Sequence, residues 1–531
     1  MDMYDYVIVG GGAAGCVLAN RLSEDRNVQV MLIEAGPRDD HPFIHMPRGV
    51  GKILSNPDYV WPYQAQSAYG QNAPPAYWLR GKGLGGSSSV NGMMYVRPQP
   101  ADFGDIAAAT SPDWAWSEMA RIFDTAEGDL SAAGRLRVST PARHPLMDRL
   151  IAAGEQLGLD TPSNVNQPDD RPKIGYCPST IFAGRRQSAA VAFLEPAMAR
   201  PNLTVVTGAV ADRILWGGNR AVGVACRVNG AVRDFSARRV ILASGTIASP
   251  AILQRSGVGD AGLLRRLGIP VVADRREVGA NLREHCALAM QWHLRHPMSL
   301  NPQFSGWRLV ANVLRYYGFR TGPMASAAYD VLGHFCSRPS LARPDAQLIA
   351  APFSIDKTKS KLAMETAPGM QLAIYPLRPR SAGSVAIQSV DPDALPQSTL
   401  DFFADEEDRR VMVDSVRFVR ALVAQSPVAD MIDHETRPGP VADTDDAILD
   451  AYREMGTTAY HAFGTCRMGK DEASVVDPMT RVRGTQGLHV ADLSIAPVMP
   501  AGNTFAPVMA MAWRAAELIR QLDEAGEHDH A

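Results

Sequence analysis

Glycine and glutamate residues near the N-terminus have the types and spacing of a site that binds a dinucleotide. Gly10, Gly12 and Gly15 form a G-x-G-x-x-G pattern after an apolar run, and Glu34 ends a second apolar run about 20 residues later. In such a site the first glycine permits a tight turn, the second lets the backbone approach a pyrophosphate, and the third allows close packing of helix and strand. The N–H groups at the helix start favour a phosphate, and Glu34 is placed to accept hydrogen bonds from a ribose hydroxyl. A glycine-rich turn without a ligand is the alternative, but strand, spacing and acid together favour a bound dinucleotide.

A second cluster of small residues lies within 80–97. Gly85 and Gly86 let the backbone come near a ligand, and the consecutive N–H groups of 87–89 form a nest for an anion. Asn91 can donate and accept hydrogen bonds at close range. A helix-capping loop is the alternative interpretation of this segment.

A third glycine-containing segment spans 245–259. We expect a strand to end at Gly245, a helix to start with Ser249 as N-cap and Pro250 as its first residue, and glycines to end that helix. The residues alone fit a packing unit as well as they fit a binding site.

His461 lies in an almost uncharged stretch of small residues, 457–466. Oxidation of an alcohol needs a group that accepts the hydroxyl proton while hydride leaves the carbon, and histidine suits this because its unperturbed pKa is ~6.5. A hydrogen-bonded structural histidine is the alternative. Asn503 precedes the last long helix, where the role of N-cap is the corresponding alternative.

Three separated stretches have the pattern of an α/β fold, in which buried parallel strands read as continuous apolar runs. The expected elements are strands at Tyr4–Val9, 28–33, Leu203–Val206, 221–228, 239–245 and 487–492, and helices at Ala13–Leu22, 248–255 and 504–522. Between about 289 and 457 alternating stretches such as 371–375 and 384–388 predict antiparallel strands. We infer a second domain laid over the nucleotide-binding one, with ligand chemistry at their junction. The aromatics interleaved there either shape a pocket or belong to the core, and core is expected for most of them: Trp307, Tyr316, Tyr317, Phe335, Phe353 and Tyr375.

The bulk properties indicate an ordinary globular protein. A chain of 531 residues requires two or more domains, and its formal net charge of −3 gives no case for nucleic acid or an anionic membrane as partner. Six scattered cysteines without a C-x-x-C pair suggest neither a zinc site nor a disulfide framework, and reduced thiols predict a cytoplasmic location. Asp2 and Asp5 argue against a signal peptide, and no apolar run approaches the ~20 residues that span a bilayer.

Four segments occur together in one order: the fingerprint at 6–36, the loop at 81–97, the segment at 245–259 and the stretch around His461. In this order the chain resembles the glucose–methanol–choline (GMC) flavin oxidoreductases over essentially its whole length. It is most similar to sorbose-dehydrogenase-like and pyridoxine-oxidase-like bacterial members. The resemblance implies that the dinucleotide is FAD. It also implies a Rossmann-like FAD-binding domain formed by 1–155, 195–288 and 458–531, and an α+β substrate domain on an antiparallel sheet formed by 289–457 with part of 156–194.

The resemblance assigns roles to individual residues. His461 aligns with the family's catalytic histidine, and Asn503 aligns with a residue that hydrogen-bonds the substrate oxygen. Asp492 and the backbone of Thr504 correspond to positions near the flavin, and Val210 to one that contacts adenine. The expected cofactor-binding residues are Gly10, Gly12, Ala13, Ala14, Gly15, Glu34, Ala35, Gly83, Gly86, Ser87, Ser88, Asn91, Gly92, Met93, Met94, Val210, Ala491, Asp492, Asn503 and Thr504. No metal site is expected.

Some positions depart from the family pattern. Val90 stands where some choline-oxidising relatives have a histidine bonded to the flavin, so FAD is expected to be dissociable. The segment around 128–137 is short, and Glu284 replaces a common aspartate; both departures concern local loop geometry rather than the chemistry. The predicted activity is oxidation of a small-molecule alcohol to an aldehyde or ketone, with oxygen or a quinone-type molecule as electron acceptor, by a monomer or small homo-oligomer. A non-redox hydroxynitrile-lyase-like enzyme and a flavin-bearing binding or sensor protein are the alternatives.

Overall fold

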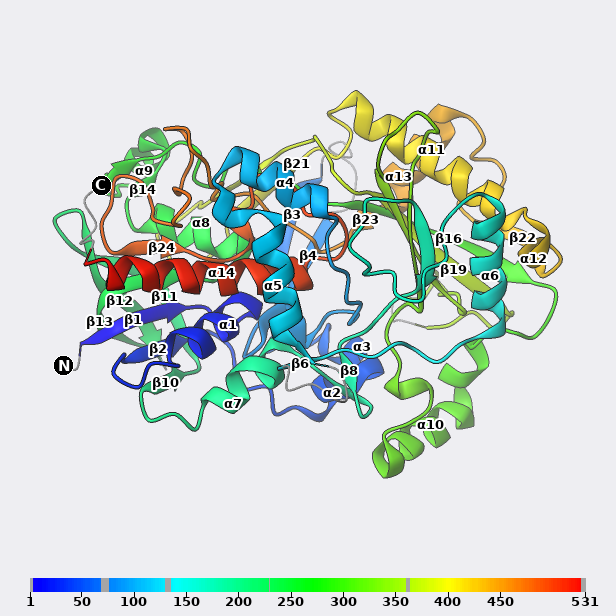
Figure 1. Cartoon of the computed structure of the whole chain (residues 1–531), viewed down its shortest axis with the longest axis horizontal. Coiled ribbons are helices and arrows are strands. Elements are labelled where there is room, and N and C mark those ends of the chain that lie inside the picture. Colours follow the sequence, from blue (N-terminus) through cyan, green and yellow to red (C-terminus); the bar gives the residue numbers. More distant parts are fainter. Residues whose placement is uncertain (1–2, 68–75, 129–134, 229, 360–362, 527–531) are drawn as a thin grey trace.

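The computed structural model describes residues 3–67, 76–128, 135–228, 230–359 and 363–526. Two bodies lie side by side along the longest axis of the molecule (Figure 1). One contains the parallel sheet with helices α1 (Ala13–Leu22) and α14 (Phe505–Glu524). The other contains a large antiparallel sheet covered by helices α6 (Pro145–Gln156), α11 (Glu406–Val423) and α13 (Asp445–Met455).

The parallel sheet has the order β10 (Leu203–Val206), β2 (Val30–Ile33), β1 (Tyr4–Val9), β13 (Ala231–Leu242), and β24 (Leu488–Val490) also pairs with β13. Residues 6–9 of β1, all of β2 and the end of β13 are buried on both faces, as their continuous apolar runs predict. Tyr4–Val9, Ala13–Leu22 and Leu203–Val206 have the predicted bounds. The expected strand at 221–228 is wrong in its direction: β12 (Arg220–Val228) is antiparallel to both β11 (Ala209–Gly217) and β13.

The helix expected to begin at Ser249 begins earlier, and Pro250 lies inside it. Helix α8 (Gly245–Arg255) has Ser244 as N-cap. Pro250 has no N–H to donate to the carbonyl of Thr246, and that carbonyl instead accepts from Thr465 Oγ1 at 2.5 Å. A side chain from a distant part of the chain therefore allows the proline within the helix. The predicted C-terminal glycine is confirmed at Gly257, which has φ of 85°.

The second sheet is antiparallel, as predicted, with the order β22 (Ile432–Arg437), β16 (Cys286–Leu294), β19 (Gly369–Pro376), β18 (Ala346–Ala351), β17 (Val331–Phe335), β7 (Lys173–Tyr176). A four-stranded sheet joins it to the first body, in the order β20 (Ser384–Ala386), β21 (Gln397–Leu400), β3 (Val60–Ser67), β4 (Ala76–Gly81). Strand β16 crosses the boundary expected between 288 and 289, and β3 pairs with β21 across the expected division. The division of the chain into domains stays a prediction.

Most of the second-domain aromatics are buried, as expected, but Trp307 and Tyr317 are exposed. All six cysteines are free. Of the helices within the described residues, none combines the length and apolar character needed to cross a membrane. Residues 129–134 of the short segment at 128–137 lie outside the described residues. Strands β5 (Glu127–Gly128) and β6 (Leu136–Arg137) pair on either side of them.

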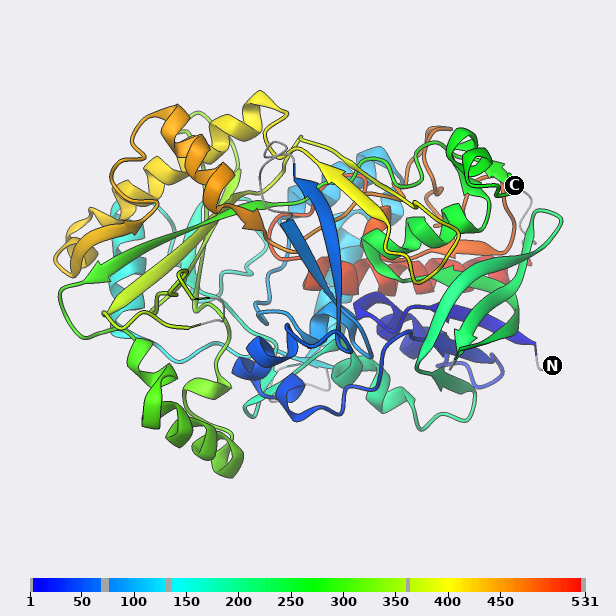
Figure 2. The same ribbon diagram turned by 180° about the vertical axis from the view of Figure 1, so that it is seen from behind.

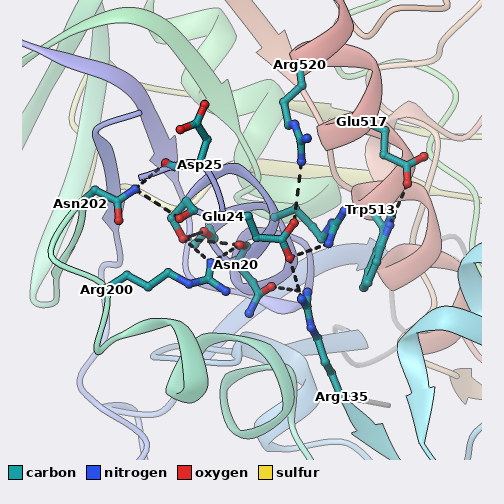
Figure 3. Close-up of polar contacts among 12 residues, drawn as sticks. Asn20, Glu24, Asp25, Arg135, Arg200, Asn202, Trp513, Glu517 and Arg520 are labelled. Carbon is teal, nitrogen blue, oxygen red and sulfur yellow. Dashed lines mark hydrogen bonds and ion pairs between the residues drawn. The ribbon is translucent and has the colours of Figure 1, made fainter. Parts of the chain in front are cut away.

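Polar contacts connect the end of α1 to α14 and to two other parts of the chain (Figure 3). Glu24 lies within 2.6 Å of both Arg21 and Arg135 and 3.8 Å from Arg520. Arg21 also lies over the ring of Trp513, 4.2 Å from its centroid. The same region thus joins the first helix to the last.

Candidate active site

The glycine loops of the first and second clusters touch and form a cradle. Gly10 has φ of 106°, and Gly86 has φ of 51°. A Cβ on Gly86 would lie 2.7 Å from Gly12 Cα, whereas a Cβ on Gly12 would meet nothing closer than Gly86 Cα at 4.0 Å. The space above Gly12 is therefore open and bordered by backbone, as a pyrophosphate requires.

A cavity of about 580 Å³ runs from this cradle to the antiparallel sheet. Most of the predicted cofactor-binding residues line it, together with His461: Gly10, Gly12, Ala13, Ala14, Glu34, Ala35, Gly86, Ser87, Ser88, Asn91, Gly92, Met93, Met94, Val210, Asp492, Asn503 and Thr504. Residues 245–248 of the third glycine-containing segment, and residues 243 and 244 before it, also line the cavity, which favours a binding role for that segment. These segments are far apart in sequence and meet only in the fold.

Three predicted residues do not line the cavity. A Cβ on Gly15 would lie 1.8 Å from the carbonyl oxygen of Gly10, so this glycine allows the helix to pack on the turn. Gly83 donates its N–H to Glu34 at 2.9 Å. Ala491 donates to the carbonyl of Leu242 and continues the pairing of β24 with β13. Their contribution to the cradle is through packing and backbone pairing.

Glu34 connects three loops through its carboxylate. Oε2 accepts from Gly11 N at 2.7 Å, and Oε1 accepts from Gly36 N at 2.8 Å and Gly83 N at 2.9 Å. Burial raises the pKa of Glu34, and these N–H groups oppose that shift. The hydrogen bond between Glu34 and a ribose stays a prediction. Holding both glycine loops is a second task of this carboxylate that the G-x-G-x-x-G pattern does not signal.

Arg186 is a buried residue that the sequence analysis did not single out. Its Nη1 donates to the carbonyl of Asn91 at 2.8 Å and to Asn91 Oδ1 at 2.7 Å, and its Nε donates to the carbonyl of Ile44 at 2.9 Å. Burial lowers the pKa of Arg186 to about 9. The guanidinium holds the second glycine cluster in place, and no motif around it in the sequence signals this.

Asp492 joins the third segment to the cradle. Its Oδ2 accepts from Gly245 N at 2.8 Å and from Ser249 Oγ at 2.5 Å, and its Oδ1 accepts from Ser494 N at 2.8 Å. Ser249 therefore bonds Asp492 rather than capping a helix.

His461 lies at the far end of the cavity, where the second body meets the first. Its Nδ1 is 2.9 Å from Nδ1 of His285, and its Nε2 is 3.3 Å from Nδ2 of Asn503. Its backbone N–H donates to Glu284 Oε1 at 2.7 Å. The preceding residue, Tyr460, has φ of 66°, a conformation that costs energy for a tyrosine and accompanies functional sites.

The hydrogen bonds of the two histidines determine their tautomers. Nε2 of His285 is 3.0 Å from the carbonyl oxygen of Leu377, which can only accept, so Nε2 carries a proton. In neutral His285 the Nδ1 atom is then an acceptor, and His461 must donate to it through its own Nδ1–H. The Nε2 atom of His461 is therefore unprotonated. It is the atom beside Asn503 in the cavity, where it can accept a proton.

Burial keeps both histidines neutral. Burial lowers the pKa of His461 well below 6.5, and His285 and Arg80 lower it further. Burial lowers the pKa of His285 to about 4. Burial raises the pKa of Glu284 to about 7, and its Oε2 has no hydrogen-bond partner among the described residues. Glu284, the residue that replaces the family's common aspartate, thus contacts His461 directly through the backbone N–H of that histidine, so its effect is not limited to loop geometry.

Asn503 is not the N-cap of the last helix; that position belongs to Thr504. Its Oδ1 accepts from Gln347 Nε2 at 3.1 Å. Gln347 also donates to Tyr375 and lies 2.9 Å from His334 through its Oε1. The amide of Asn503 is therefore oriented from the antiparallel sheet, with Nδ2 toward His461.

One face of the antiparallel sheet forms the wall of the cavity beyond His461. On β19 the alternate residues Gln371, Ala373 and Tyr375 line the cavity, while the residues between them are in the core. Ala287 and Ala289 of β16 add small side chains to this wall. The wall is predominantly apolar, and Gln371 Nε2 donates to the hydroxyl of Tyr329 at 2.7 Å.

The described residues include no group of three or more His, Cys, Asp or Glu side chains that could hold a metal ion. A dinucleotide cradle that opens onto a buried neutral histidine instead places the chain among enzymes that work with a dinucleotide cofactor. Within this class it belongs to the GMC oxidoreductase family, whose N-terminal model matches residues 4–287 and whose C-terminal model matches 379–512.

Relatives match the chain along its whole length. An alcohol dehydrogenase (acceptor) from Pseudomonas putida is 36% identical over 538 residues, covering 98% of this chain and 97% of that protein. An oxygen-dependent choline dehydrogenase from Paraburkholderia xenovorans is 37% identical over 532 residues, covering 97% and 94%. The structure of pyridoxine 4-oxidase from Mesorbium loti has a TM-score of 0.87 at 27% identity, covering 98% and 99%. A mutated formate oxidase from Aspergillus oryzae has a TM-score of 0.90 at 25% identity, covering 99% of each chain. These matches confirm the predicted family, the fold class and FAD as the cofactor.

Proposed function

We propose that the chain oxidises an alcohol to an aldehyde or ketone, with His461 accepting the hydroxyl proton and Asn503 orienting the oxygen. FAD, when bound in the cradle, supplies the hydride acceptor at flavin N5. The observation that carries the proposal is the unprotonated Nε2 of His461 in the cavity, which follows from its bonds to His285 and onward to Leu377. Family membership and the names of the relatives support an alcohol as substrate.

His461 and the residues around it have different roles in the proton transfer. Nε2 takes the proton while Nδ1–H stays bonded to His285, so the imidazolium keeps a partner on its far side. Nδ2 of Asn503, 3.3 Å from His461 Nε2, can donate to the substrate oxygen as negative charge develops there. Glu284, in its anionic form, favours the charged imidazolium. His285 and Glu284 are positioning residues because they act through His461.

The substrate is a neutral alcohol in this proposal. Glu34 and Asp492 are the only acidic residues that line the cavity within the described chain, and backbone N–H groups hold both at the nucleotide end. The wall beyond His461 offers aromatic and small apolar side chains together with Gln371 and Tyr329, and no carboxylate to pair with a cation. The cationic side chains of Arg80 and Lys357 also line the cavity, so we expect a quaternary ammonium alcohol such as choline to be a poorer substrate than a neutral alcohol, although relatives include choline dehydrogenases.

FAD is proposed to be bound without a covalent link, because the aliphatic side chain of Val90 lines the cavity where a linking histidine would stand. Acid precipitation of the purified protein should release intact FAD into the supernatant. Flavin that stays with the precipitated polypeptide would contradict this.

The test of the function is anaerobic mixing of the FAD-loaded protein with a panel of neutral alcohols and choline. Bleaching of the yellow flavin by neutral alcohols supports the proposal, and their aldehyde or ketone products identify the reaction. Cleavage of a hydroxynitrile without bleaching would indicate the lyase alternative instead. Repeating the turnover with oxygen and with a quinone-type acceptor distinguishes the two predicted routes of reoxidation.

A further inference from the structure

Helix α10 (Gly306–Phe319) carries a row of exposed apolar side chains. Trp307, Val310, Leu314, Tyr317 and Phe319 are between 56% and 78% exposed. The first four recur at intervals of three and four residues, so they lie on one side of the helix. We call these four residues the outer face of α10. In both views α10 extends beyond the rest of the ribbon at the lower edge of the molecule (Figures 1 and 2).

The opposite side of α10 is firmly packed, so the exposure is not that of a frayed segment. Leu309, Val313 and Tyr316 contact Met46 and Met324 in a separate apolar cluster. The hydroxyl of Tyr316 donates to the carbonyl of His45 at 3.2 Å, and Asn312 Nδ2 donates to the carbonyl of Gln303 at 2.9 Å. Because the opposite side of α10 is packed against the protein in this way, the four residues of the outer face point toward the solvent.

The charges on α10 and at its C-cap, Arg320, are all positive. Arg308, Arg315 and Arg320 are exposed, and residues 306–320 contain no aspartate or glutamate. None of the three arginines forms an ion pair within the part of the chain that the structure describes; Arg315 bonds only Thr321 Oγ1, and Arg308 lies beside the ring of Trp307. Two copies packed through this face would bring like charges together without a carboxylate to pair them. Anionic headgroups would pair them directly.

We propose that the outer face of α10 docks the protein onto an anionic lipid surface. A helix with Trp, Leu and Tyr on one side and arginines beside it lies in the plane of the interface and inserts its apolar side among the headgroups. The net charge of −3, which predicts no attraction to such a surface, averages over the whole chain and conceals this local excess. The protein binds peripherally, through this helix, and does not cross the bilayer.

The position of α10 connects docking to the cavity. The helix packs on Met46, and the chain continues from there into Val50 and Leu54, which line the cavity. Docking through α10 therefore brings this wall toward the lipid, where apolar alcohols and quinone-type acceptors dissolve. The docking itself rests on the outer face of α10 and the arginines beside it, and it holds whichever substrate the cavity takes.

The experiment is flotation of the FAD-loaded protein with vesicles of phosphatidylcholine containing about one-third phosphatidylglycerol, and with phosphatidylcholine alone. We expect flotation with the anionic vesicles that weakens with salt. Trp307→Gln with Leu314→Gln should weaken binding about tenfold or more, because these side chains no longer insert. Arg308→Gln with Arg315→Gln should reduce the preference for anionic vesicles about fivefold for each arginine removed. Val441→Gln, which changes a side chain exposed to 83% elsewhere, is the matched control and should float like the wild type.

Unchanged flavin content and unchanged flavin reduction in solution would show that the α10 variants are folded. The proposal is overturned if wild-type protein floats with neither vesicle at low salt, or if the α10 variants float as well as it does. It is also overturned if the protein forms a dimer in sedimentation that Trp307→Gln with Leu314→Gln dissociates, while vesicles bind neither form. That last result would assign the face to a second copy of the chain.

Discussion

His461 and His285 are 176 positions apart in the chain, yet their Nδ1 atoms are 2.9 Å apart. Replacing His461 by alanine should keep FAD and substrate binding, because the cradle does not depend on it, and should slow flavin reduction by about 10²–10⁴. Anaerobic stopped-flow absorbance measures this rate constant. His293→Ala is a suitable control, since His293 pairs with Glu365 and does not line the cavity. A His461→Ala protein reduced at the wild-type rate would show that the base lies elsewhere.

The pH dependence should contain two steps. Because the pKa of His461 is lowered well below 6.5, its imidazole loses the ability to accept a proton only in the acid range, and the rate falls there. As pH rises further, Glu284, whose pKa is raised to about 7, becomes anionic and then favours the imidazolium. The rate therefore increases in a second step near neutral pH. Glu284→Gln should remove the step near neutral pH while the acid step stays. A profile for that variant identical to the wild type would remove Glu284 from the mechanism.

His285 tests the tautomer argument directly. His285→Leu removes the acceptor for the Nδ1–H of His461, so that histidine can hold its proton on either nitrogen, and flavin reduction should slow by about 10- to 100-fold. His285→Asn places an amide oxygen near the former Nδ1 and should recover part of the rate. Nitrogen NMR of labelled His461 should show the Nδ1–H tautomer in wild type and a mixture in His285→Leu. Equal rates for the leucine and asparagine variants would assign His285 a packing role only.

At the scale of elements, the contact between the two glycine loops separates folding from cofactor binding. Gly86→Ala places a Cβ 2.7 Å from Gly12 Cα at a positive φ, and should destabilise the FAD-free protein by about 1–3 kcal/mol. Gly12→Ala meets only open space in the protein and should leave that stability nearly unchanged, yet block the approach of the pyrophosphate.

Thermal unfolding of the FAD-free protein and fluorescence titration with FAD measure the two effects. Gly104→Ala in α4 (Pro100–Ala109) is the control, since a Cβ there meets nothing and alanine suits a helix interior. Tight FAD binding by Gly12→Ala would place the pyrophosphate elsewhere in the cavity.

The sequence predicted the elements whose periodicity is set locally, and it predicted the glycine positions because their spacing carries the chemistry. Tyr4–Val9 and Ala13–Leu22 have the expected bounds, and Gly10, Gly12 and Gly86 form the cradle. The direction of β12 could not be predicted, because an apolar strand reads alike in parallel and antiparallel pairs. The start of α8 was misjudged because the bond that allows Pro250 comes from Thr465, more than 200 residues away.

The residues that surround His461 were beyond sequence reasoning for the same reason. Strand β23 (Thr457–Thr458) pairs with the start of β16, and an antiparallel bridge between Arg283 and Phe463 lies on the other side of His461. Together these pairings bring Glu284 and His285 next to His461. Gln347 of β18 donates to Asn503, which lies 156 positions further along the chain. The spacing of residues along the sequence does not indicate which strands pair. The sequence therefore gave no reason to distinguish Glu284, His285 and Gln347 from ordinary strand or loop residues.

At the scale of the whole molecule, Glu24 connects the first helix to distant segments (Figure 3). Glu24→Gln leaves Arg21, Arg135 and Arg520 without their shared carboxylate and should lower the free energy of unfolding by about 1–2 kcal/mol, less at high salt. Urea unfolding at two salt concentrations checks this. Asp450→Asn, which breaks an exposed pair with Arg453, should change stability little and serves as control. Equal changes in the free energy of unfolding for the two substitutions would mean that the arginines around Glu24 stabilise the protein no more than one exposed ion pair does.

The cradle is assembled from four segments, the last of which reaches Thr504, and α1 packs against α14 near the C-terminal end. During synthesis on the ribosome, the N-terminal fingerprint emerges first but faces an incomplete pocket until nearly the whole chain has been translated. The apolar side of α1 also stays exposed until α14 has been synthesised, and such exposed apolar surface on a nascent chain is what chaperones bind. FAD consequently binds only after synthesis of the chain is nearly complete. Ribosome-bound chains that end before residue 487 should therefore retain no FAD, whereas the released full-length chain should acquire it.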